Sequence, residues 1–246
     1  MKYLITFSYD GTNYYGYQKQ PNKKTIQNEI ECALKKINNK KVVISSSGRT
    51  DAKVHALNQK AHFILDKEIP EEKLKSALNS LLPDDIYVKK VEIVNDEFHA
   101  RFSFKAKEYI YKINMGEYNP LEKNYVYQLN HKLDVAEMER ALKYLEGTHD
   151  FKSFSKTYEE EKDYVRTIVQ TNLIRDIKNV NELTICFLGT GFLRYMVRNM
   201  VGTLIEIGEG KRKSEDIIDI LASCDRTKAG KTAPPEGLYL NNVFYN

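Results

Sequence analysis

The chain has 246 residues and a net charge of +4, and its 38 lysines and arginines accompany 17 tyrosines and 10 phenylalanines, a balance that suits either binding to a nucleic acid or ordinary solubility. Cys32, Cys186 and Cys224 lie far apart without a Cys-x-x-Cys pair, which argues against a disulfide framework and a zinc site and favours a reducing cytoplasm. No signal segment precedes the first strand and no apolar run approaches about 18 residues, so we expect neither export nor a membrane span.

The first half of the chain, residues 1–104, shows the element order of a ferredoxin-like unit. Alternation along residues 3–9 predicts a strand, and apolar residues at helical spacing predict helices behind Thr25 and after Pro70. Further runs predict strands near 42–46, 61–65 and 86–93. The resulting order, β-α-β-β-α-β, is the ferredoxin-like signature.

The second half, residues 105–246, repeats this order loosely. Its predicted elements are strands near 107–114, 165–175, 183–188 and 238–245, a helix from Asp134 and a helix over 192–207. The insertion from Lys152 to Asp163 is too charged to belong to a core. These patterns predict an α+β protein in which two similar halves can share one sheet.

The residues from Ser47 to Leu57 have the character of an active-site loop. A single carboxylate, Asp51, stands there among Gly, Arg, Thr and His, between the strand-like runs 42–44 and 61–65. Catalytic residues are often carried on loops that a rigid scaffold holds in place. Gly-Arg-Thr-Asp is also a turn-like sequence, so these residues alone leave an ordinary surface turn as the alternative.

Ser47–Ala56 resembles the Gly-Arg-Thr-Asp-Ala-Gly-Val-His-Ala signature of the tRNA pseudouridine synthase A (TruA) family, although Lys53 stands where that signature has Gly. Three later segments agree in the same order, namely 98–103 with 107–111, 191–198 with Gly202, and 233–240. The resemblance spans nearly the whole chain. It implies two ferredoxin-like halves that share a central, mainly antiparallel sheet with helices packed on it, a basic cleft between the halves, and a homodimer.

The resemblance further implies an isomerase, which Asp51 would serve as nucleophile, acting on uridines 38, 39 and 40 of the tRNA anticodon arm. Conversion to pseudouridine breaks the N1–C1′ bond and joins C5 to C1′, and neither attack at C6 nor participation at C1′ requires a metal or an organic cofactor. The target base must first leave the helix stack, at a cost of a few kcal/mol. The family motif implies that Arg49 fills the vacated space, while a phosphate contact is the alternative.

Arg198 falls on a predicted helix that is apolar around much of its circumference, so its charge needs a partner. The resemblance implies Asp51 as that partner, and a guanidinium that reaches solvent is the alternative. Tyr109 matches the family's active-site tyrosine, which implies stacking on the uracil and, less directly, acceptance of the C5 proton. His55 and His62 are interpreted as structural.

Other functions fit the sequence less well. Gly230-Lys231-Thr232 and Gly189-Thr190-Gly191 fail the spacing of phosphate and dinucleotide loops, so we expect neither ATP nor NAD. A paralogue acting on another RNA, such as ribosomal RNA, remains the first alternative. A non-catalytic RNA-binding module is a second, against which the intact Asp51 speaks. An Asp-based hydrolase would need a second carboxylate or a metal cluster.

Overall fold

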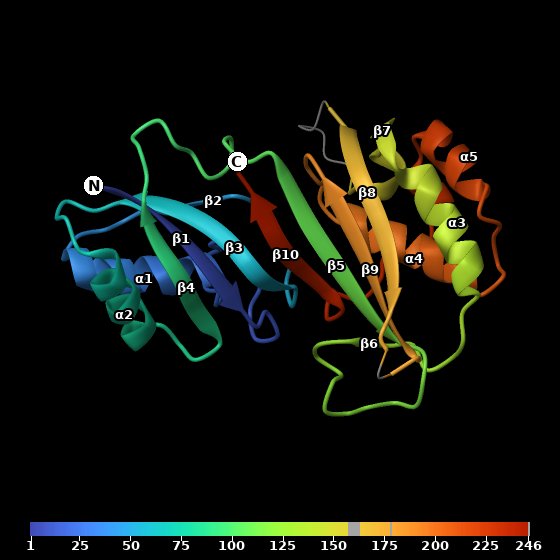
Figure 1. Cartoon of the computed structure of the whole chain (residues 1–246), viewed down its shortest axis with the longest axis horizontal. Helices are drawn as coiled ribbons and strands as arrows, with labels where there is room; N and C mark the ends of the chain where they lie inside the picture. Colours follow the sequence, from blue (N-terminus) through green and yellow to red (C-terminus); the bar gives the residue numbers. More distant parts are fainter. Residues whose placement is uncertain (157–162, 178, 246) are drawn as a thin grey trace. The chain divides into compact units, whose positions relative to one another are not determined.

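The computed structural model describes residues 1–156, 163–177 and 179–245, which form two compact units (Figure 1). Unit 1 comprises Met1–Lys105 and Tyr239–Asn246, and unit 2 comprises Ala106–Leu238. These described ranges contain ten strands and five α-helices, so the predicted mixture of helices and strands is confirmed. None of the helices in them is long and apolar enough to cross a membrane.

Unit 1 has the strand order β4-β1-β3-β10, with the short β2 beside β3. Its elements are β1 (Lys2–Tyr9), α1 (Ile26–Asn38), β2 (Ser45–Ser46), β3 (His55–Ile64), α2 (Glu71–Leu81), β4 (Ile86–Ile93) and β10 (Leu238–Phe244), of which β10 begins one residue before the boundary of the unit. Strand β1 is antiparallel to β3 and β4, β2 is antiparallel to β3, and β10 is parallel to β3.

Apolar spacing explains the two helices of unit 1. In α1, Ile26, Ile30 and Leu34 recur every four residues and are all fully buried, so one stripe of the helix faces the core. The helix ends where Asn39 takes a left-handed backbone with φ 57°. In α2, Leu74 and Leu78 have the same role. Figure 1 shows α1 and α2 side by side against the sheet.

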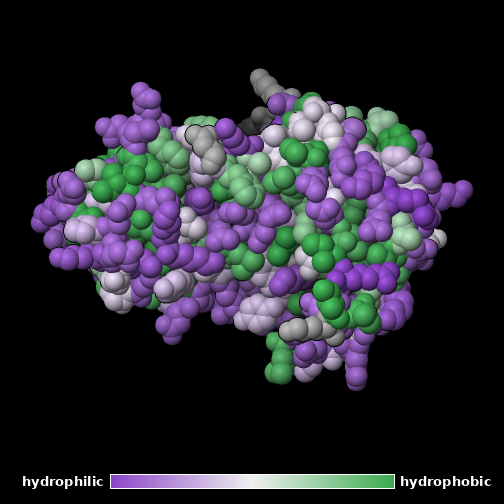
Figure 2. Space-filling model, in the orientation of Figure 1, coloured by the Kyte–Doolittle hydropathy of each residue, from purple (hydrophilic) through white to green (hydrophobic). Residues whose placement is uncertain are grey.

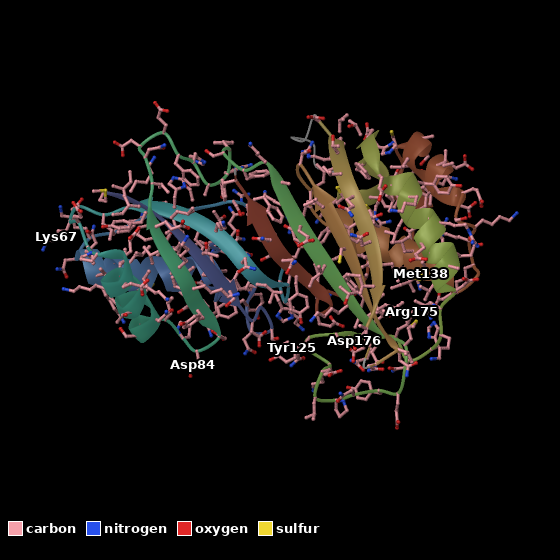
Figure 3. All side chains as sticks on the ribbon, in the orientation of Figure 1. Lys67, Asp84, Tyr125, Met138, Arg175 and Asp176 are labelled. Carbon is pink, nitrogen blue, oxygen red and sulfur yellow. The ribbon has the colours of Figure 1, made fainter. Side chains whose placement is uncertain are left out.

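Unit 2 has the strand order β5-β9-β8-β7, with the short β6 beside β5. Its elements are β5 (Ala106–Asn114), β6 (Tyr127–Gln128), α3 (Val135–Leu145), β7 (Gly147–Asp150), β8 (Val165–Arg175), β9 (Glu182–Gly189), α4 (Met196–Gly208) and α5 (Asp216–Ser223). Helix α3 starts at Asp134, whose carboxylate accepts the backbone N–H of Glu137 at 3.1 Å. Met138, fully buried on α3, is labelled in Figure 3.

Four sequence predictions need correction. The strand expected near 42–46 pairs with β3 only at Ser45–Ser46, and the strand expected near 61–65 already begins at His55. The helix expected over 192–207 begins at Met196, because Tyr195 has a left-handed backbone with φ 63° that no α-helix can include.

The fourth correction concerns the charged insertion from Lys152 to Asp163. Its beginning does belong to the core, since a short 3₁₀ turn over Lys152–Phe154 buries Phe154 completely. Residues 157–162 of the insertion lie outside the described residues. Helix α5 and strand β7 were not predicted.

Candidate active site

Asp51 lies on the loop that connects β2 to β3. Its side chain is half-buried, while Arg49 and Lys53 on either side of it are exposed. The backbone N–H of Val54 donates to the Asp51 carbonyl at 3.2 Å, which closes a tight turn, and Lys53 within that turn has φ 64°. Asp51 thus lies in a tight, partly exposed turn of unit 1, two residues away from a cationic residue on either side in the sequence.

The connection between β1 and α1 fixes this turn through backbone hydrogen bonds. The N–H of Tyr17 donates to the Thr50 carbonyl at 3.1 Å, and the N–H of Lys53 donates to the Tyr14 carbonyl at 3.2 Å. The hydroxyls of Tyr9 and Thr50 are hydrogen-bonded at 2.8 Å in the buried interior. Backbone groups on both sides of Asp51 are thus tied to one neighbouring segment, so the main chain that carries the carboxylate is held in place.

Gly16 makes this close approach possible. It has φ +95°, and a Cβ on it would stand 2.9 Å from the Thr50 carbonyl oxygen and 3.2 Å from the Ala52 nitrogen. Only glycine combines that backbone conformation with that contact. The sequence signal for this support is the pair of glycines, Gly11 and Gly16, just ahead of a predicted helix.

Side chains of β3 hold the other flank of the loop. The backbone N–H of Gly11 donates to His55 Nδ1 at 3.1 Å, and the imidazole stacks on the ring of Tyr239 with centroids 4.7 Å apart. Gln59 accepts from the Ser47 hydroxyl at 2.6 Å and donates to the Gly48 carbonyl at 3.1 Å. His55 is 2% exposed, so these contacts fit its interpretation as a structural residue.

His62, further along β3, is also held within unit 1. Its Nδ1 accepts the backbone N–H of Ala100 at 3.1 Å, and His99 meets its ring with centroids 4.6 Å apart. Burial, followed by repulsion from His99, lowers the pKa of His62 to about 4. The imidazole is therefore neutral at pH 7, as acceptance of a backbone N–H requires.

Tyr109 lies in unit 2 on β5, opposite Phe187 of β9. It is 8% exposed, and the edge of its ring meets Phe192 with centroids 5.0 Å apart. Two residues on, Tyr111 is fully buried and donates its hydroxyl proton to the Pro234 carbonyl at 2.7 Å. Burial also raises the pKa of Tyr111 well above its usual value, so Tyr111 has the contacts of a packing residue.

Arg198 lies on α4 in unit 2, where its Nε donates to the Ala233 carbonyl at 2.7 Å. Its guanidinium carbon stands 5.2 Å from the centre of the Tyr195 ring, within cation–π range. The return bond runs from the Ala233 N–H to the Arg198 carbonyl at 3.0 Å. The Ala233 carbonyl and the face of the Tyr195 ring therefore support this cation. Neither partner was predicted from the sequence. Its expected pairing with Asp51 remains a prediction.

The segment around Ala233, which accepts the hydrogen bond from Arg198, packs directly on α4. A Cβ on Gly202, one turn after Arg198, would stand 1.6 Å from the Lys231 carbonyl oxygen. No other residue permits that approach. Gly202 and the segment from Lys231 to Ala233, which stand far apart in the sequence, thus pack directly against each other.

Three comparisons relate the chain to known proteins. A family profile described as tRNA pseudouridine synthase matches residues 5–103 and 141–246. The protein "tRNA pseudouridine synthase A" of Exiguobacterium sp. strain AT1b is 49% identical over 241 residues, which cover 98% of this chain and 96% of that protein. The protein of the same name from Bacillus licheniformis is 46% identical over the full length of both chains. Among solved structures, a chain of a Cbf5-Nop10-Gar1 complex is 12% identical with a TM-score of 0.35 over 82% of this chain and 54% of its own.

Proposed function

Because the chain belongs to the tRNA pseudouridine synthase family, we propose that it isomerises uridine to pseudouridine in tRNA, at positions 38, 39 and 40 of the anticodon arm. The relatives that share nearly half of its residues over their whole length carry the name tRNA pseudouridine synthase A. The observation that carries the proposal is the turn around Asp51, whose backbone is fixed by hydrogen bonds and whose half-buried carboxylate residue stands between Arg49 and Lys53 in the sequence.

In this proposal Asp51 is the nucleophile. A carboxylate can add to C6 of the uracil or act at C1′, and in either case the glycosidic bond breaks, the base turns and C5 bonds to C1′. Arg49, exposed two residues before Asp51, enters the space that the target base leaves when it flips out of the stack. The rigid support from Gly16 and Tyr17 favours this chemistry, because it fixes the nucleophile without induced fit.

Residues of unit 2 complete the proposed site. Tyr109 stacks on the uracil, and its edge contact with Phe192 supports a fixed ring orientation. Arg198 pairs with Asp51 and keeps that carboxylate ionised. The Ala233 carbonyl and the Tyr195 ring support this role, because they restrain the guanidinium through its Nε and its planar face.

The same proposal includes the organisation of the protein. The halves 1–104 and 105–246 act as two ferredoxin-like parts with a shared sheet and a basic cleft, the first carrying the Asp51 loop and the second completing the site. The antiparallel order β4-β1-β3-β2 within unit 1 supports the ferredoxin-like assignment. We further propose that the protein is a homodimer and that it works in the cytoplasm. The three free cysteines are in keeping with that reducing compartment.

One assay tests the function directly. The chain is incubated with unmodified tRNA that carries tritium at uridine C5, and released tritium is counted while pseudouridine is mapped along the product. We expect tritium release with pseudouridine confined to positions 38, 39 and 40. Modification of ribosomal RNA in preference to tRNA would instead favour the paralogue, which the substitution of Lys53 for the family's Gly keeps open. Binding without tritium release would favour the RNA-binding module.

A further inference from the structure

The connection between β1 and α1 forms an open groove in unit 1 that the catalytic proposal does not use. Its volume is about 510 Å³, and polar and basic side chains line it, among them Lys19, Lys23 and Lys24. Hydrophilic side chains cover much of the visible face of the molecule (Figure 2). An open groove does not enclose a ligand as a buried apolar pocket does, so we consider which ligand its three lysine ammoniums can bind.

The lysines of this groove are held in place but remain available to a ligand. Lys23 lies over the Tyr15 ring, 4.3 Å from its centroid, and makes no ion pair with any residue that the structure describes. Lys19 and Lys24 have acidic partners, Glu31 at 3.4 Å and Asp85 at 3.7 Å, and their side chains remain 50% and 45% exposed. The Lys24–Asp85 pair is partly exposed and therefore weak, so a phosphate can displace it. The Lys19 ammonium is exposed enough to contact a phosphate while it keeps its bond to the buried Glu31.

The groove is joined rigidly to the Asp51 turn. The backbone N–H of Tyr15 donates to the Lys24 carbonyl at 3.0 Å, which closes the groove's own loop. The next two residues, Gly16 and Tyr17, are those that pack against and hydrogen-bond to Thr50 beside Asp51. An anion bound in the groove is therefore held at a fixed position relative to the turn that carries the carboxylate.

We propose that this groove binds the sugar-phosphate backbone of tRNA and thereby anchors the substrate to the Asp51 turn, an inference that rests on the proposed function. Lysine ammoniums are compact point charges that suit phosphate oxygens without reading a base. Three of them within six residues match a chain of phosphates better than a single small anion. The expected signature is salt-dependent affinity that does not depend on tRNA sequence.

The test compares charge removal inside and outside the groove. Lys19→Gln/Lys23→Gln removes two groove cations, and Lys67→Gln/Lys73→Gln removes two exposed lysines elsewhere in unit 1, of which Lys67 is labelled in Figure 3. The dissociation constant is measured for two different unmodified tRNAs over a range of salt. The groove variant should bind both tRNAs roughly tenfold more weakly, with a salt slope smaller by about two, because each lost phosphate contact removes nearly one unit.

Three controls separate the outcomes. Lys23→Gln alone, which removes no hydrogen bond or ion pair, should lower the slope by about one even if the double variant is unstable. An unchanged slope in both groove variants, or equal losses in the Lys67/Lys73 control, would overturn the proposal, as would weakening confined to one tRNA. Tritium release by the unaltered chain is recorded separately, so failure of the proposed function is visible whatever the slopes show.

Discussion

The backbone of Gly16 lies so close to the Thr50 carbonyl that a single added methyl group would come within 2.9 Å of its oxygen. This contact joins the β1–α1 connection to the residue next to Asp51. Positioning of the proposed nucleophile therefore depends on a residue that itself carries no functional group. Several variants test this dependence and the proposed roles.

Gly16→Ala should reduce turnover far more than it reduces fold stability. The new methyl group displaces the Thr50 carbonyl and with it the Asp51 turn, so we expect kcat to fall at least tenfold, since a misplacement of about 1 Å costs up to 10²-fold. Gly210→Ala is the matched control, because Gly210 also has positive φ but nothing within 4 Å of its Cβ position. Both variants should lose about 1 kcal/mol in urea unfolding from backbone strain. Equal kcat in the two variants would contradict the argument.

Asp51→Asn should abolish pseudouridine formation while tRNA still binds. The amide is nearly isosteric with the carboxylate but is not a nucleophile, so turnover is lost and the fold is kept. Asp84→Asn serves as control, because Asp84 is an exposed carboxylate of the same unit at the turn before β4 (Figure 3). Tritium release and filter binding are measured on both variants. Turnover by Asp51→Asn at a substantial fraction of the unaltered rate would remove Asp51 from the nucleophile's role.

Arg198→Leu should lower kcat by about a hundredfold and move the acid limb of the pH–rate profile upward. Removing the guanidinium raises the pKa of a carboxylate that it pairs with, so activity would disappear at higher pH as the solution is acidified. Loss of the bond to the Ala233 carbonyl should cost about 1 kcal/mol of stability. Arg194→Leu is the control, because it removes a neighbouring cation that also faces the Tyr195 ring. An acid limb that moves equally in both variants would refute a specific Arg198–Asp51 pair.

Lys53→Gly should stabilise the protein slightly and weaken tRNA binding. The native φ of 64° costs a non-glycine residue about 1 kcal/mol, which glycine relieves in part. If the ammonium contacts a phosphate, the salt slope drops by roughly one for every RNA. Lys53→Asn separates the effects, because asparagine tolerates this backbone yet lacks the charge. A changed ratio of rates on tRNA and ribosomal RNA would instead make Lys53 a specificity residue.

Stability should fall with acid through His62. Its pKa is about 4 in the folded chain against 6.5 for the ordinary side chain, so the unfolded chain binds more protons between these values. The stabilisation is complete above pH 6.5 and is lost progressively toward pH 4, by about 1 kcal/mol at pH 5 once screening by solvent is allowed for. The free energy of unfolding in urea is measured at pH 5 and at pH 7.5 for the unaltered chain and for His62→Asn, which keeps an acceptor for the Ala100 N–H. The difference between the two pH values should be smaller in the variant by that amount. Equal differences would contradict the assignment.

Periodicity predicted the elements of this chain well where burial is one-sided. Helix α1 follows from Ile26, Ile30 and Leu34, and strand β4 was predicted with its observed bounds, Ile86–Ile93. Prediction failed where the backbone conformation of a single residue decides where an element begins. Nothing in the composition of residues 192–195 shows that Tyr195 takes a left-handed conformation and delays α4 to Met196. Strand β7 was missed because its four residues, Gly147–Asp150, are polar and pair only with β8.

The candidate site divides in the same way. Asp51, Arg49, Tyr109 and Arg198 are predicted site residues because their motifs resemble a known family. Their supports were not found, since a carbonyl acceptor such as Ala233 for Arg198, or a backbone contact such as Gly16 with Thr50, depends on atoms that every residue has. The chemistry of a side chain can be inferred from the sequence, whereas its main-chain partners can be identified only from the folded structure.

The parallel pairing of β10 with β3 has a consequence for biosynthesis. Strand β3 begins at His55, beside the Asp51 turn, and its neighbour supplies Tyr239 to stack on that histidine and a carbonyl at Asn241 for the Asn58 amide. During translation, more than a hundred residues of unit 2 leave the ribosome between these two strands. At roughly 5–20 residues per second, the growing chain carries an open β3 edge for many seconds. Until its last strand arrives, the His55–Ala56 end of β3 therefore lacks the backbone partner that it has in the folded unit.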